Sequence, residues 1–253
     1  NGVISLLQEH GDDARVIAGG HSLIPLMKLR MAEVPHLIDL QSISELTGIE
    51  SGSIIRIGAM TTQADIIDNA SLASSAPILK EASLQIADPQ VRYMGTVGGN
   101  VANGDPGNDM PGLMQCLDAT FILRGPNGER EVKARDFYHA AYMTEREDDE
   151  VMVAVTFDAP KGGYAYEKQK RKIGDYATAA AAVIISKDGS KCKEASIAMT
   201  NLSDTPVFCG AASDALIGTS VSAEDIKNAV SSMIDAIDPA EDNRGPVEFK
   251  KHA

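Results

Sequence analysis

Two glycine pairs with polar neighbours are the residues of this sequence best suited to binding a ligand. The first pair lies in the run Ala18-Gly19-Gly20-His21-Ser22, directly after an apolar segment. Glycine lets a main-chain turn approach a ligand closely, and the amide groups that open a helix attract an anion. The run therefore suits a bound diphosphate, although a glycine pair is equally a feature of tight strand-to-helix turns.

The second pair, Gly98 and Gly99, lies between Thr96 and Asn100. The hydroxyl and the amide supply donors for phosphate oxygens without adding charge. Two such segments in one acidic chain favour capture of a diphosphate by main-chain amides. Neither has the G-x-G-x-x-G spacing of a Rossmann site or the Gly-Lys-Ser/Thr ending of a P-loop, which argues against an NAD site of that type and against a P-loop ATPase.

Short elements of alternating type must position these two segments. Apolar runs predict strands at 15–18 and 36–40 and helices at 2–9 and 24–31, which together form a small α/β unit. Its short, continuous apolar strands indicate a sheet buried on both faces. The stretch 95–111 holds five of the 22 glycines, and we expect it to be a functional loop outside the core.

Turn and cap signals predict the elements that follow. Thr62 with Asp65, and Ser222 with Asp225, have the spacing of capped helix starts. Hairpin turns are expected at 125–128 and around 188–189. The other expected elements are strands at 54–57 and 151–157, a helix at 76–87, a linker at 160–163 and a C-terminal helix that ends near residue 237.

Composition limits the function classes that remain. The 253 residues are 43% apolar and 23% charged, enough for a core that needs no disulfide or metal. The net charge of −13 argues against a nucleic-acid partner. The histidines have no metal-ligand spacing, and the three cysteines are widely spaced, without a CxxC or iron–sulfur pattern. No apolar run is long enough for a transmembrane segment.

Longer motifs give the sequence a family resemblance. The segments that carry it are Ala18–Arg30, Asp88–Arg92, Gly95–Asn100, Asn103–Asp109, Tyr166–Arg171 and Gly174–Ala177. Together they resemble the FAD-binding medium subunits of molybdenum hydroxylases, whose relatives include aerobic carbon monoxide dehydrogenase and the FAD domain of xanthine dehydrogenase. The resemblance covers nearly the whole chain. One departure is Tyr93-Met94, where relatives have a smaller or more polar pair.

The resemblance implies an α+β fold in which a two-lobed FAD-binding domain of the vanillyl-alcohol-oxidase (PCMH) type precedes a small α+β domain. The expected boundaries are 1–52 and 53–160 for the two lobes and 161–253 for the C-terminal domain of CO dehydrogenase flavoprotein type. It also implies that this chain holds FAD without a covalent bond. Molybdopterin and 2Fe–2S clusters are expected on partner subunits.

Binding residues of the family map onto this sequence one by one. Those expected to hold the pyrophosphate and ribityl chain are Ala18, Gly19, Gly20, His21, Ser22, Thr96, Gly98, Gly99 and Asn100. Asp109 is expected at the adenosine ribose and Met152 beside the isoalloxazine. Lys168, Asp175 and Tyr176 are expected near the ring, where a cation stabilises a reduced anionic flavin. No catalytic acid or base and no metal ligand is expected here.

The implied function is electron transfer within a cytoplasmic complex of three kinds of subunit. Electrons would pass from molybdenum on a large partner, through iron–sulfur clusters on a small partner, to this flavin and then to an external acceptor. A dimer of heterotrimers and a position at the inner face of the membrane both fit the family, and exposed apolar patches are expected where partners dock. Two alternatives stay open: a self-sufficient FAD oxidase or reductase, which needs a general acid near the flavin, and an assembly subunit that has lost FAD.

Overall fold

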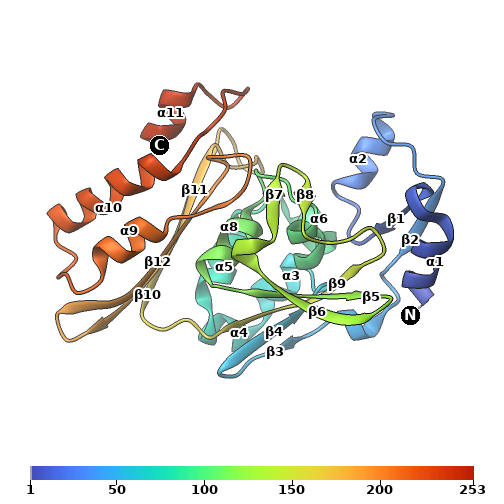
Figure 1. Cartoon of the computed structure of the whole chain (residues 1–253), viewed down its shortest axis with the longest axis horizontal. Coiled ribbons are helices and arrows are strands. Elements are labelled where there is room, and N and C mark those ends of the chain that lie inside the picture. The colour runs from blue at the N-terminus through green and yellow to red at the C-terminus, as the bar shows by residue number, and fades with distance from the viewer. Residues whose placement is uncertain (1) are drawn as a thin grey trace.

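Two antiparallel sheets organise the chain, which a computed structural model describes over residues 2–253 (Figure 1). The first sheet has the order β3-β4-β9-β5-β6 and the second the order β10-β11-β12-β13. The first consists of β3 (Ile49–Glu50), β4 (Ile54–Gly58), β9 (Val151–Asp158), β5 (Thr120–Gly125) and β6 (Gly128–Lys133). The second consists of β10 (Gly163–Gln169), β11 (Ala179–Asp188), β12 (Lys191–Thr200) and β13 (Val207–Phe208). Both predicted hairpins, β5-β6 and β11-β12, are confirmed.

A small N-terminal unit lies at the right of Figure 1. It consists of α1 (Gly2–His10), β1 (Ala14–Ile17), α2 (Leu23–Lys28) and β2 (His36–Asp39), and β1 pairs in parallel with β2. Leu7 of α1 shares a buried cluster with Ile38 of β2. Leu37 points to the opposite face, where it is 43% exposed, because side chains alternate along a strand. The expectation of a sheet buried on both faces is therefore wrong.

Six helices follow along the chain between β4 and β5. They are α3 (Gln63–Asp68), α4 (Ala70–Ser75), α5 (Pro77–Gln85), α6 (Pro89–Met94), α7 (Val97–Ala102) and α8 (Asp109–Cys116). The predicted capping box at the start of α3 is present: the Asp65 amide donates to the Thr62 hydroxyl, and the Thr62 amide donates to the Asp65 carboxylate. A short hairpin, β7 (Tyr138–Ala140) with β8 (Met143–Thr144), follows β6.

The expectation that residues 95–111 form a loop holds only for 103–108, because α7 and the start of α8 occupy most of the rest and are largely buried. Thr96 caps α7 by accepting a hydrogen bond from the Gly99 amide. A Cβ atom on Gly98 would overlap Ala59, so this glycine permits close packing of α7 on the chain beyond β4. Gly98 and Gly99 therefore lie in a helix that enters the core, whereas Gly104 and Gly107 lie in the turn between α7 and α8.

The second sheet is covered on both faces. Helix α8 packs on β11 and β12, and Leu113 of α8 shares the main buried cluster with Ala180 and Ala198 of this sheet. On the other face lie α9 (Gly210–Leu216) and α10 (Ala223–Ala236), and α11 (Val247–His252) ends the chain (Figure 1). The Ser222–Asp225 capping box of α10 is confirmed. Within residues 2–253, no helix combines the length and apolar character that crossing a membrane requires.

Candidate functional site

A cavity of about 670 Å³ lies where the N-terminal unit, α7, β9 and the end of β10 meet. Its volume is within the range of small-molecule sites in proteins. Every cofactor-binding residue predicted from the sequence lines it. They are Ala18, Gly19, Gly20, His21 and Ser22 between β1 and α2; Thr96, Gly98, Gly99 and Asn100 at the start of α7; Asp109 on α8; Met152 on β9; Lys168 on β10; and Asp175 and Tyr176 before β11.

The first glycine loop (Ala18–Ser22) and the second glycine segment (Thr96–Asn100) lie against each other. A Cβ atom built on Gly99 would lie 3.4 Å from the Cβ of Ala18. A Cβ atom on Gly19 would overlap the main-chain carbonyl of Met94, two residues before the second segment. The chain therefore needs glycine at position 19 to bring the two segments together.

The two segments differ in the main-chain donors that they offer. In the second segment the amides of Val97, Gly98 and Gly99 donate to the Thr61 carbonyl at 3.0 Å, the Ala59 carbonyl at 2.8 Å and the Thr96 hydroxyl at 3.1 Å. In the first glycine loop the amides from Gly19 to Ser22 have no hydrogen-bond partner within residues 2–253. The amides of Val97, Gly98 and Gly99 are therefore already paired within the protein, whereas those of the first loop are unpaired.

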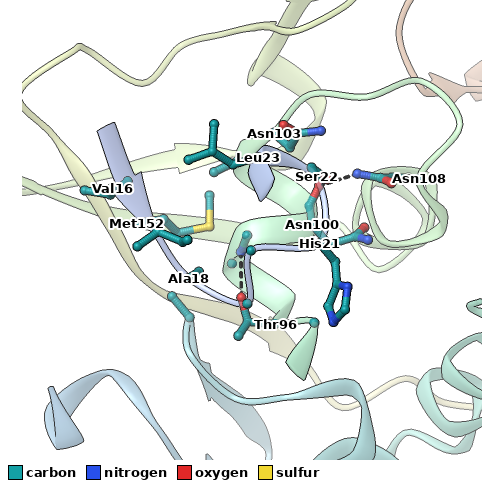
Figure 2. A pocket seen from close by; sticks show the side chains of 18 of the residues that line it. Val16, Ala18, His21, Ser22, Leu23, Thr96, Asn100, Asn103, Asn108 and Met152 are labelled. Atoms are coloured by element: carbon teal, nitrogen blue, oxygen red, sulfur yellow. Dashed lines mark hydrogen bonds between the residues drawn. The ribbon is translucent and has the colours of Figure 1, made fainter. Parts of the chain in front are cut away.

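Side chains divide the cavity wall into an apolar and a polar part (Figure 2). Val16, Ala18, Leu23 and Met152 lie together on one side, whereas His21, Ser22, Asn100 and Asn108 lie on the other. The carboxamide nitrogen of Asn108 donates to the Asn100 carbonyl at 2.9 Å, which ties α7 to the start of α8. An apolar wall beside unpaired amides suits a flavin dinucleotide, which combines a flat aromatic ring with a charged linker.

A buried ion pair lies at the wall formed by α8 and β10. The Lys168 ammonium is 2.8 Å from Asp109 Oδ2, and the two side chains are 1% and 5% exposed. The Tyr166 hydroxyl donates to Asp109 Oδ1 at 2.5 Å. Burial raises the pKa of Asp109, whereas the charge and hydrogen bond of Lys168 and the hydrogen bond from Tyr166 lower it. Burial and the adjacent carboxylate raise the pKa of Tyr166, which keeps its phenol protonated as a donor.

This ion pair changes one expectation. Asp109 was expected at the adenosine ribose and Lys168 near the flavin ring, which lie at opposite ends of an extended dinucleotide. Asp109 and Lys168 contact each other, so the structure does not separate the two positions that were expected for them. Sequence motifs could not show this, because 59 positions of chain separate the two residues.

Asp175 and Tyr176 lie at the edge of the cavity, before β11. The hydrogen bond from Arg171 Nε, at 2.9 Å, lowers the pKa of Asp175. The Tyr176 ring lies beside Gly107 and is 40% exposed. An aromatic ring in this position can cover one side of a bound ligand.

Two residues at or behind the cavity wall were not predicted from the sequence as part of the site. Gln63 lines the cavity and is 1% exposed, and its Nε2 atom has no partner within residues 2–253. Tyr166 is buried behind the wall and binds Asp109. No motif marks Gln63, whereas Tyr166 lies within a segment of the family resemblance and was given no role there.

The fold and the cavity define a FAD-binding flavoprotein subunit, and comparison with known proteins places it. Residues 1–160 match the family described as FAD binding domain in molybdopterin dehydrogenase, and residues 164–253 match the CO dehydrogenase flavoprotein C-terminal domain. The chain belongs to this family, as the FAD-binding medium subunit of a carbon monoxide dehydrogenase-type molybdenum hydroxylase. It is therefore an oxidoreductase subunit of this type. The predicted family resemblance and α+β fold are confirmed.

Individual relatives agree with this assignment. The chain is 53% identical to the carbon monoxide dehydrogenase medium chain of Afipia carboxidovorans and 46% identical to that of Hydrogenophaga pseudoflava, over 98% of this chain and 87% of each relative. The structure matches a chain of cyanide-inactivated Cu,Mo-CO dehydrogenase with a TM-score of 0.97, at 52% identity over 99% of this chain and 88% of that one. It matches a chain of quinoline 2-oxidoreductase from Pseudomonas putida 86 with a TM-score of 0.93, at 33% identity over the same shares of the two chains.

Proposed function

We propose that this chain accepts electrons from iron–sulfur clusters on a small partner subunit and passes them through FAD to an external acceptor. Substrate oxidation takes place at molybdenum on a large partner. The bound FAD supplies the redox chemistry. The observation that carries the proposal is the cavity in which the unpaired amides of the first glycine loop face residues of α7, β9 and β10.

Each part of the wall has its own task in this proposal. The amides from Gly19 to Ser22 bind the diphosphate, and the Ser22 hydroxyl and the Asn100 side chain add donors beside them. Met152 and its apolar neighbours pack against the isoalloxazine. Lys168 holds a positive charge at the wall, and Asp109 holds Lys168 in place. Tyr176 covers the opening.

The first glycine loop is suited to an anion because its donors are already ordered. Gly20 has a φ of +73°, and its carbonyl accepts a hydrogen bond from the Ile24 amide at 2.9 Å. The loop therefore enters α2 in a fixed conformation with its amides unpaired. Binding of a diphosphate to these amides therefore costs little conformational entropy of the main chain.

The alternatives find less support. A self-sufficient oxidase needs a general acid at the flavin. Two buried carboxyl groups within residues 2–253 line this cavity: Asp109 is engaged by Tyr166 and Lys168, and Glu150 is engaged by Arg130. The unpaired amides beside a cavity of this size argue against an assembly subunit that has lost FAD. The named relatives are medium chains of larger complexes, which favours the electron-transfer role.

Large partners and a cytoplasmic location are part of the same proposal, as is assembly into a dimer of heterotrimers. The surface carries exposed apolar side chains, among them Ile173 at 90%, Met31 at 72% and Tyr93 at 68%. Methionine and tyrosine are enriched in surfaces that pack against another protein. The domain boundaries at 52/53 and 160/161 also remain proposals.

Titration of the purified full chain with FAD tests the proposal. We expect a yellow 1:1 complex and much weaker binding of riboflavin, which has the ring but no diphosphate. In the native source, molybdenum, iron and a large subunit should purify with this chain. A chain that stays colourless after FAD is added, or that binds riboflavin as tightly as FAD, would contradict the proposal.

A further inference from the structure

Tyr166 has no place in the cavity wall, yet it contacts the charged group behind that wall. It is 3% exposed, and its hydroxyl donates to Asp109 Oδ1 at 2.5 Å. The other carboxylate oxygen, Oδ2, accepts from Lys168 Nζ at 2.8 Å. Each oxygen of this buried carboxylate thus has its own donor, which fixes the orientation of the group.

The surroundings fix Tyr166 and Lys168 relative to each other. They are two positions apart on β10, so their side chains point to the same face of the strand. Gln85 of α5 also joins them, because its side-chain Nε2 donates to the Tyr166 carbonyl at 3.3 Å and its main-chain carbonyl accepts from Lys168 Nζ at 3.2 Å. The three side chains Tyr166, Asp109 and Lys168 therefore form one rigid buried cluster.

The cluster leaves one donor of Lys168 unused. An ammonium group has three N–H donors, and Asp109 and Gln85 take two of them within residues 2–253. Lys168 itself lines the cavity, as does Asp109. The remaining N–H has no acceptor within residues 2–253, which leaves it as the donor that a ligand at this wall could use.

We infer that Tyr166 is a positioning residue for FAD: its phenol fixes the Asp109 carboxylate, which holds the Lys168 ammonium at the cavity wall with one N–H left for the cofactor. This inference rests on the proposed function. It assigns to a residue outside the cavity a role that acts through Asp109.

The test compares two tyrosines of the same strand in the full chain. Tyr166→Phe removes only the buried hydroxyl, and Tyr164→Phe is the matched control at a residue that is 39% exposed. A hydrogen bond to a charged group contributes on the order of a tenfold change in an equilibrium constant or more. The FAD dissociation constant should therefore rise roughly tenfold in Tyr166→Phe and stay unchanged in Tyr164→Phe.

A double variant separates positioning from a general effect on folding. Asp109→Asn should also weaken FAD binding, and adding Tyr166→Phe to it should change the dissociation constant by less than about twofold, because the phenol acts through the carboxylate. Equal tenfold losses in both backgrounds, or a Tyr166→Phe chain that binds FAD like the wild type, would overturn the inference.

The pH profile of FAD binding gives a second readout. The charged and titratable groups that act on Asp109 are Lys168, Tyr166, Lys170 and Tyr176. Removing the Tyr166 hydrogen bond raises the pKa of Asp109 further, so binding should weaken at a higher pH in Tyr166→Phe than in the wild type. An unshifted profile would overturn the inference.

A variant that does not fold and a wild type that does not bind FAD each have a defined interpretation. If Tyr166→Phe does not fold, Asp109→Asn alone must raise the dissociation constant at least tenfold, and an unchanged constant overturns the inference. If wild-type chain binds no FAD, the proposed function fails; if wild type binds and Tyr166→Phe binds equally well, only the inference fails.

Discussion

Replacing Lys168 by methionine should destabilise the chain strongly, because it leaves the Asp109 carboxylate buried without its cation. The two side chains are 1% and 5% exposed, so water does not replace the lost partner. Removing one member of a buried ion pair typically costs about 3–5 kcal/mol. Folded proteins have unfolding free energies of about 5–15 kcal/mol, so the loss is a large part of the total. Urea unfolding, followed by circular dichroism, measures it.

The loss should depend on pH in a defined direction. Burial raises the pKa of Asp109 and the charge of Lys168 lowers it, so the Lys168→Met substitution raises this pKa further. A folded-state pKa above the unfolded value means that stability falls as pH rises through the range between them. The destabilisation should therefore be larger at about pH 8 than at about pH 5, because lower pH favours the neutral carboxyl group, which needs no cation.

Two matched variants control the measurement. Lys172→Met removes an exposed lysine of the same segment and should change the unfolding free energy by less than about 0.5 kcal/mol. Lys168→Met combined with Asp109→Asn has no buried charge and should recover most of the loss. A Lys168→Met loss of less than about 1 kcal/mol that is equal at both pH values would refute the buried-pair argument.

Three substitutions around the first glycine loop test the binding geometry. Gly99→Ala places a methyl group between Thr96 and Ala18 and should weaken FAD binding about tenfold. The higher helix propensity of alanine should keep the change in unfolding free energy within about 1 kcal/mol. FAD titration and urea unfolding measure the two effects, and unchanged binding would refute the close approach of the two segments. Gly19→Ala should lower the unfolding free energy by about 1–3 kcal/mol, because the added Cβ overlaps the Met94 carbonyl. A thermal melt checks this loss of stability, and a variant that is fully stable but no longer binds FAD would contradict the prediction. Ser22→Ala should raise the FAD dissociation constant about fivefold without changing stability, and an unaltered constant in the same titration would remove Ser22 from the site.

Helix caps and hairpin turns could be predicted from the sequence because they are formed by residues close together in the chain. The capping boxes at Thr62 and Ser222 are both present, because a cap is formed by residues three apart in the chain. The hairpins at 125–128 and 188–189 follow from their turn residues in the same way. The family resemblance extended this to the site, since every predicted binding residue lines one cavity.

The errors arose where tertiary contacts decide the role of a residue. Gly98 and Gly99 resembled a loop in sequence, yet Gly98 lies against Ala59, a residue almost 40 positions away, inside a buried helix. Whether an amide is unpaired depends on such contacts too: the Gly98 amide is used by the Ala59 carbonyl. Lys168 lies in a basic stretch, and only the fold shows that it is buried against Asp109.

The most direct test of the central claim is an experimental structure of the full chain with FAD bound. We expect oxygens of the diphosphate within hydrogen-bond distance of the amides from Gly19 to Ser22, while the amides of Gly98 and Gly99 keep their partners in the protein. A diphosphate bound elsewhere in the chain, or held mainly by the amides of the second glycine segment, would contradict the account.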